Sequence, residues 1–177
     1  MDFNKHRALD LPEEDRIAYL KVVASLAAAD GTIGDREIEL IRSACEDFGI
    51  DGQEIDGVVA VARDPEQAEI QRTVESLKES PLRFTLLADL TFVAHADGRY
   101  TKEERVEIVE ISQILNTTYD QLIAVDRYVE AKRKGGKAAG GAPPEFMGFN
   151  RNTPAGLGAK NYLGIKWLAA KIGKTGG

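Results

Sequence analysis

The sequence predicts an all-α protein: a compact bundle of about seven helices with an internal pseudo-two-fold helix–Asp-Gly–helix repeat, followed by a glycine-rich C-terminal extension. Three observations support this fold class. Apolar residues recur with the helical period, and no segment shows a convincing two-residue alternation of a β-strand. Helix start and stop signals separate these segments at short intervals. The segment 82–96 is apolar on nearly every side, which is typical of a helix buried by its neighbours.

The segment 82–96 is expected to be the central helix of the bundle. Its only charged or titratable side chains are Arg83, Asp89 and His95. At about 15 residues it is shorter than the roughly 20 that a membrane-spanning helix needs. On such an apolar helix, we expect His95 to be a core histidine rather than a catalytic one.

Six further helices are expected around this segment. Capping boxes at Thr101–Glu104 and Thr118–Gln121 mark two of the starts, and Asp64 before a proline marks a third. Glycines and a Ser-Pro pair mark the ends. The expected helices cover residues 12–29, 35–48, 53–62, 64–79, 101–115 and 118–134.

The charge distribution divides the 177 residues into an acidic body and a basic tail. The net charge of −6 is the balance of −11 over residues 1–134 and +5 over residues 135–177. We therefore assign a helical domain to residues 10–134 and a separate tail to residues 135–177. An acidic body does not favour nucleic-acid binding, because phosphate contacts require basic surface.

The remaining composition gives no sign of a targeting or membrane-spanning segment, and peripheral contact with a membrane stays open. The single cysteine, Cys45, excludes an internal disulfide and is in register with core positions, so we expect a buried residue rather than a reactive thiol. The N-terminal residues lack the apolar region of a signal peptide. No uninterrupted apolar run reaches the length of a membrane span.

Two segments of the chain repeat one another at a distance of 67 residues. Each contains an apolar helix, Ala-Asp-Gly, a large side chain two residues after the glycine, and a glutamate seven residues after the aspartate. The first copy contains Asp30, Gly31 and Glu37, and the second contains Asp97, Gly98 and Glu104. The pattern is not an EF-hand, because Leu26 and Ala28 would occupy loop positions one and three of the first copy, where calcium ligands are required.

The duplicated unit resembles the TerB-like family, which includes the tellurite-resistance TerB proteins and the N-terminal domain of DjlA-type co-chaperones. The resemblance covers roughly residues 10–132 and rests on the aspartates, glycines and glutamates of the two copies. It implies a cytoplasmic, non-enzymatic module linked to stress response and membrane-associated complexes, with acidic residues that bind a metal ion. The chain departs from the family pattern at Gly34, where a Ser or Thr cap is usual, and in its glycine-rich basic tail.

Three roles are open for the acidic residues of the repeat. Helix capping and Asp-Gly turns account for all four carboxylates without an ion. Alternatively, the two loops converge and bind a divalent cation, Ca²⁺ or Mg²⁺, through Asp30, Glu37, Asp97 and Glu104. In the third, basic side chains of a partner protein dock there.

No catalytic motif is recognised in the sequence. It lacks a glycine-rich phosphate loop, and its two histidines, His6 and His95, show no spacing that predicts a catalytic pair with Cys45. We therefore expect a non-enzymatic protein-interaction module or accessory subunit of a larger assembly, with the tail as anchor. The alternatives are a tellurite or stress-response metal-binding protein and a carboxylate-based metalloenzyme.

The tail contains a predicted amphipathic helix at residues 159–172. Lysines occupy one face, apolar side chains occupy the other, and Trp167 lies near the boundary. This segment is expected to bind a protein partner, a membrane surface or the chain's own domain. The candidate contact residues of the tail are Phe146, Met147, Phe149, Tyr162, Ile165, Trp167, Leu168 and Ile172.

Overall fold

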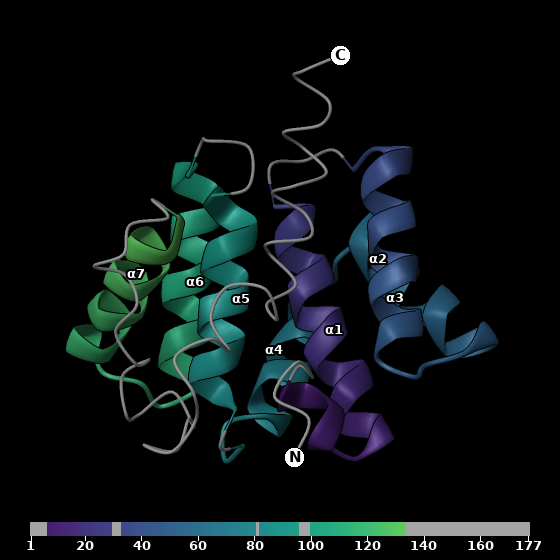
Figure 1. The fold of residues 1–177 in the computed structure, drawn as a ribbon, viewed down its shortest axis with the longest axis horizontal. Coiled ribbons are helices and arrows are strands. Elements are labelled where there is room, and N and C mark those ends of the chain that lie inside the picture. The colour runs from purple at the N-terminus through teal and green to yellow at the C-terminus, as the bar shows by residue number, and fades with distance from the viewer. Residues whose placement is uncertain (1–6, 30–32, 81, 96–99, 134–177) are drawn as a thin grey trace.

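The computed structural model describes residues 7–29, 33–80, 82–95 and 100–133. These residues form a short 3₁₀-helix and seven α-helices, and they contain no β-strand, so the predicted all-α class is confirmed (Figure 1). The 3₁₀-helix η1 spans Arg7–Asp10. The α-helices are α1 (Glu13–Ala27), α2 (Asp35–Asp47), α3 (Gly52–Arg63), α4 (Gln67–Ser76), α5 (Arg83–His95), α6 (Lys102–Ile114) and α7 (Tyr119–Arg133).

Helices α1 and α5 form the centre of the bundle. Every residue from Phe84 to Ala94 in α5 is buried, which confirms the expectation of a helix covered on all sides. Helix α1 contacts α2, α3, α4, α5 and α6, whereas α7 packs on α5. Both central helices run in the same direction, so their C-terminal ends lie at one end of the bundle (Figure 1).

A buried hydrogen bond joins the two central helices. The Tyr19 hydroxyl of α1 donates to Asp89 Oδ2 of α5 at 2.7 Å, and the Asp89 side chain is completely buried. A buried carboxylate is tolerated when hydrogen-bond donors replace its lost hydration. Asp89 therefore belongs to the core and fixes how α1 and α5 pack against each other.

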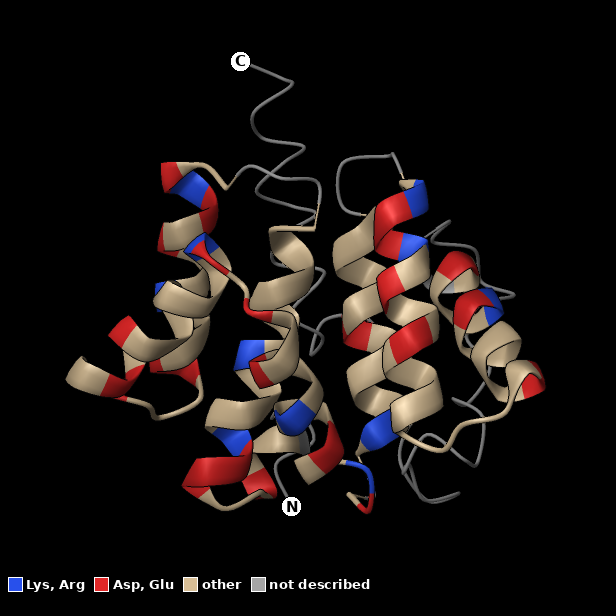
Figure 2. Ribbon diagram, turned by 180° about the vertical axis from the view of Figure 1, so that it is seen from behind, with Lys and Arg blue, Asp and Glu red and all other residues tan. Residues whose placement is uncertain are grey.

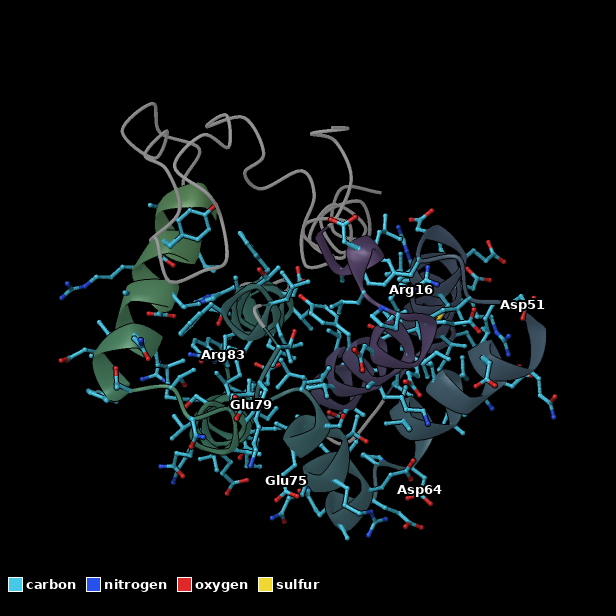
Figure 3. All side chains as sticks on the ribbon, turned by 90° about the horizontal axis from the view of Figure 1, so that it is seen from below. Arg16, Asp51, Asp64, Glu75, Glu79 and Arg83 are labelled. Carbon is cyan, nitrogen blue, oxygen red and sulfur yellow. The ribbon has the colours of Figure 1, made fainter. Side chains whose placement is uncertain are left out.

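The side chains between the helices fill the interior (Figure 3). Arg16 of α1 reaches to the end of α2, where its Nη1 donates to the Phe48 carbonyl oxygen at 2.7 Å. The carbonyls of the last helical turn lack intrahelical partners, so this contact supplies one of the missing donors. Gly49 then adopts a left-handed φ of 70°, the usual conformation for a residue that ends a helix.

The predicted capping boxes of α6 and α7 are confirmed. Thr101 and Glu104 exchange two hydrogen bonds of 2.9 and 3.2 Å, and Thr118 and Gln121 do the same at 2.9 and 3.2 Å. The predicted start of α4 at Asp64 is wrong. The Asp64 N–H bonds to the Ala60 carbonyl at the end of α3, and α4 begins only at Gln67.

Several predictions fall on residues outside the described part of the chain. These are Asp30 and Asp97 of the repeat and the whole tail with its proposed contact residues. The internal repeat itself also remains a prediction. Among the residues that the structure describes, no helix combines the length and hydrophobicity required to cross a membrane.

Candidate functional site

The two described glutamates of the repeat are both bound to the backbone at a helix start. Glu37 Oε2 accepts from the Gly34 N–H at 2.8 Å, and Glu104 Oε2 accepts from the Thr101 N–H at 2.9 Å. Thr101 returns the bond through its hydroxyl, but Gly34 has no side chain with which to do so. Glu104 therefore belongs to a complete capping box with two hydrogen bonds. Of those two bonds, Glu37 forms only the one in which its side chain accepts from the backbone N–H.

The starts of α2 and α6 lie at the same end of the bundle (Figure 1). This arrangement follows from the common direction of α1 and α5, since each is followed by a helix that runs back along it. Within the described ranges, no group of three or more His, Cys, Asp or Glu side chains is placed to hold a metal ion. Because Asp30 and Asp97 lie outside those ranges, the four-carboxylate metal site remains a prediction.

Cys45 is buried in the core, as expected, whereas His95 at the end of α5 is only partly buried, with 14 % of its side chain exposed. Burial raises the pKa of the Cys45 thiol from 9.0 to about 11, which leaves almost no nucleophilic thiolate at neutral pH. The His95 and Tyr100 rings are in contact, with centroids 4.6 Å apart and planes tilted by 57°, and His95 Nε2 lies 3.6 Å from Asp126 Oδ1. Packing within the bundle therefore accounts for both side chains.

A surface recess of about 440 Å³ lies between the end of α1, the start of α4 and one face of α6. We call it the α6 recess. Its residues include small side chains from α1 and acidic side chains from α6, and Figure 2 shows the acidic positions recurring along α6. The recess is lined by Ser25, Ala28, Ala29, Pro65, Gln67, Lys102, Glu103, Val106, Glu107 and Glu110.

Helical periodicity explains why α6 presents these side chains together. Glu103, Glu107 and Glu110 are separated by four and three residues, so they follow one another along a single face. Val106 lies in the same stripe and is 47 % exposed. Among the described residues, only Val106 and Tyr119 are large hydrophobic side chains that are exposed. The stripe therefore combines negative charge with accessible apolar surface.

Glu107 is the partly buried carboxyl of the recess. Burial raises its pKa, and the nearby Glu110 and Glu104 carboxylates add to this effect, while a hydrogen bond from Ser25 opposes it. That bond is 3.2 Å long, whereas the same hydroxyl lies 2.7 Å from the Val22 carbonyl. Since a hydroxyl has one hydrogen, the closer carbonyl competes for it, and Glu107 is left poorly compensated.

None of the three recess glutamates forms an ion pair with another described residue. A cation placed in the recess would meet a carboxylate that has already lost part of its hydration, beside an apolar side chain. Lysine and arginine match both features, since each carries a charged head on an apolar stem. The arrangement suits binding of a basic segment.

Sequence reasoning missed this site. In the sequence, the carboxylates of α6 have the pattern of an ordinary solvated helix face. No neighbouring residue in the sequence indicates that α1 covers part of that face. Ser25 and Glu107 are 82 residues apart in the chain. The one available signal was Val106, an apolar residue in an otherwise acidic stripe.

The fold and this site define the chain as an all-α domain with an acidic surface recess. The family of the tellurite resistance protein TerB matches residues 16–127, which is most of the helical bundle. The chain belongs to the TerB family, as its repeat suggested. No curated protein sequence and no solved structure matches it.

Proposed function

We propose that this TerB-family protein is a non-enzymatic protein-interaction module that binds a basic, partly apolar segment of a partner protein in the α6 recess. The observation that carries the proposal is the position of Glu107. Its carboxyl is partly buried without a cationic partner among the described residues, and it lies beside exposed Val106.

Binding a cation at this position relieves an existing cost. Burial disfavours the ionised form of Glu107, and a lysine or arginine head group restores favourable electrostatics. The apolar stem of the same side chain covers Val106, which releases water from apolar surface. The flanking Glu103 and Glu110 attract the segment and exclude acidic competitors.

A binding titration tests this proposal. A fluorescein-labelled designed peptide, with leucine and lysine in a helical pattern, is added to the full chain and followed by anisotropy. The recess variant is Glu103→Gln/Glu107→Gln/Glu110→Gln. The control variant, Glu39→Gln/Glu46→Gln/Glu54→Gln, removes the same charge from exposed positions on α2 and α3.

In chains that carry Lys166→Glu/Lys171→Glu, so that the basic tail does not compete, we expect the recess variant to bind the peptide roughly tenfold more weakly, because each exposed ion pair contributes about 0.2–1 kcal/mol. The control variant should bind like the wild type. A counterpart peptide with glutamate in place of lysine should not bind. Equal losses in both variants would show that general charge, rather than the recess, attracts the peptide.

A second candidate function is metal binding at the duplicated loops, as the family resemblance implies. The common location of the α2 and α6 starts at one end of the bundle supports it (Figure 1). Calorimetric titration of the full chain with Ca²⁺, Mg²⁺ and Zn²⁺ should give heat that is lost in Asp30→Asn/Asp97→Asn. Absence of heat, with no change in Tm at millimolar metal, would rule this site out.

A further inference from the structure

We infer that the α6 recess has an intramolecular ligand: the chain's own segment 159–172, which occupies the recess and competes with partner segments. This inference rests on the proposed function, since it concerns the same surface. It makes the tail a regulator of the recess.

Charge complementarity favours this occupant. The recess carries three glutamates and one lysine, and residues 1–134 carry a net charge of −11. Residues 135–177 carry +5, and the polar face predicted for the segment contains Lys160, Lys166 and Lys171. Three of the six basic side chains of the tail therefore lie on the segment whose chemistry fits the recess.

The apolar face of the segment has a counterpart as well. Val106, Ala28 and Ala29 supply exposed or partly exposed apolar surface in the recess. If the segment is helical, Ile165, Leu168 and Ile172 share one face and can cover this surface. Lysines at the edges of that face then reach the glutamates of α6.

The connection between the helical domain and the segment 159–172 is long enough for the segment to reach the recess. The 24 residues between positions 134 and 159 span up to about 80 Å when extended, and about 25–30 Å on average when flexible. A domain of this size has a radius of gyration of about 14 Å, so the segment reaches every part of the surface.

Because the segment is attached to the same chain, a weak affinity is enough for it to occupy the recess most of the time. If the glycine-rich connection is flexible, it gives an effective concentration on the order of 1 mM. A segment with a separate Kd of about 100 μM would then occupy the recess about 90 % of the time. The same competition makes an added peptide bind about tenfold more weakly.

The single tryptophan of the chain gives a direct readout, because Trp167 lies in the segment. We expect Trp167 of the full chain to show blue-shifted emission and protection from acrylamide. The recess variant, Glu103→Gln/Glu107→Gln/Glu110→Gln, should lose both, whereas the control variant should keep them. The tail variant Lys166→Glu/Lys171→Glu leaves the helical domain unchanged, so it gives the same test without substitutions in the fold.

Three results would overturn the inference. The first is a solvent-exposed Trp167 in the wild-type chain. The second is a protected Trp167 that does not respond to the recess variant, which places the segment elsewhere. The third is protection that depends on protein concentration, which assigns the segment to a second copy.

The designed lysine peptide separates this inference from the proposed function. We expect the tail variant to bind that peptide about tenfold more tightly than the wild type, because its own segment no longer competes. Equal binding by both chains would contradict the intramolecular ligand and leave the proposed function intact. No binding by either chain would contradict the proposed function.

Discussion

Helices α5 and α6 follow one another in the chain but use their carboxylates in opposite ways. Asp89 of α5 is completely buried and accepts a 2.7 Å hydrogen bond from Tyr19. Glu107 of α6 is half-buried in a recess, and its 3.2 Å bond from Ser25 is shared with a backbone carbonyl. The first carboxylate holds two helices together, whereas the second is available for a ligand. Under the proposed function, compensation by nearby donors, rather than burial alone, separates a structural acid from a binding one.

The largest effect should come from placing a charge inside α5. Leu90 is 0 % exposed, so Leu90→Asp buries an uncompensated carboxylate. We expect a loss of more than about 4 kcal/mol, which approaches the whole stability of a typical domain. Circular dichroism should show an unfolded chain. Val106→Asp on α6 is the matched control and should fold normally; similar damage from both would erase the contrast between the helices.

The second prediction concerns the hydrogen bond to Asp89. Tyr19→Phe removes a buried donor, so it should lower the free energy of unfolding by about 1–3 kcal/mol. Tyr119→Phe makes the same chemical change at a side chain that is 72 % exposed, and we expect almost no effect. Denaturant unfolding compares the two. A Tyr19→Phe protein as stable as the wild type would mean that Asp89 does not depend on Tyr19.

The sequence predicted α5 more completely than it predicted α6. Burial of α5 could be read from residues 82–96, since a helix that is apolar on all sides is stable in water only when its neighbours cover it. The capping box Thr101–Glu104 was equally local. The recess could not be predicted, because it depends on α1 approaching α6 across 82 residues of sequence. The prediction that Asp64 caps α4 was wrong for a related reason. Only three residues connect α3 and α4, and Asp64 is used to end α3, so it does not also begin α4.

A third, smaller effect should follow from the start of α6. Thr101→Ala removes the hydroxyl that accepts from the Glu104 N–H, which should cost about 1 kcal/mol. Thermal unfolding measures this loss. Binding of the lysine peptide should be nearly unchanged, because Glu103 and Glu107 remain on the helix. A large loss of binding with intact folding would mean that the cap positions the recess residues.

The smallest effect should come from Glu107 itself, and it should have the opposite sign. Its pKa is raised in the folded state, so the folded chain holds a proton that the unfolded chain releases. Stability therefore falls as the pH rises through the window between the unfolded and folded pKa values. In the tail variant Lys166→Glu/Lys171→Glu, where the chain's own lysines do not compensate the charge, Glu107→Gln should raise Tm at pH 7, and the difference should vanish below the unfolded pKa. A lower Tm at pH 7 would show that the Ser25 bond outweighs desolvation.

The most direct test of the recess is the pKa of Glu107, measured by carbon NMR of its carboxyl group. The tail variant Lys166→Glu/Lys171→Glu is used, so that the chain's own lysines do not compensate the charge. We predict a pKa above the ordinary glutamate value in the free protein and a fall when the lysine peptide binds. Peptide affinity should then decrease as the pH drops through that pKa. A Glu107 pKa that stays constant while the peptide binds would place the cation elsewhere and contradict the role of the recess.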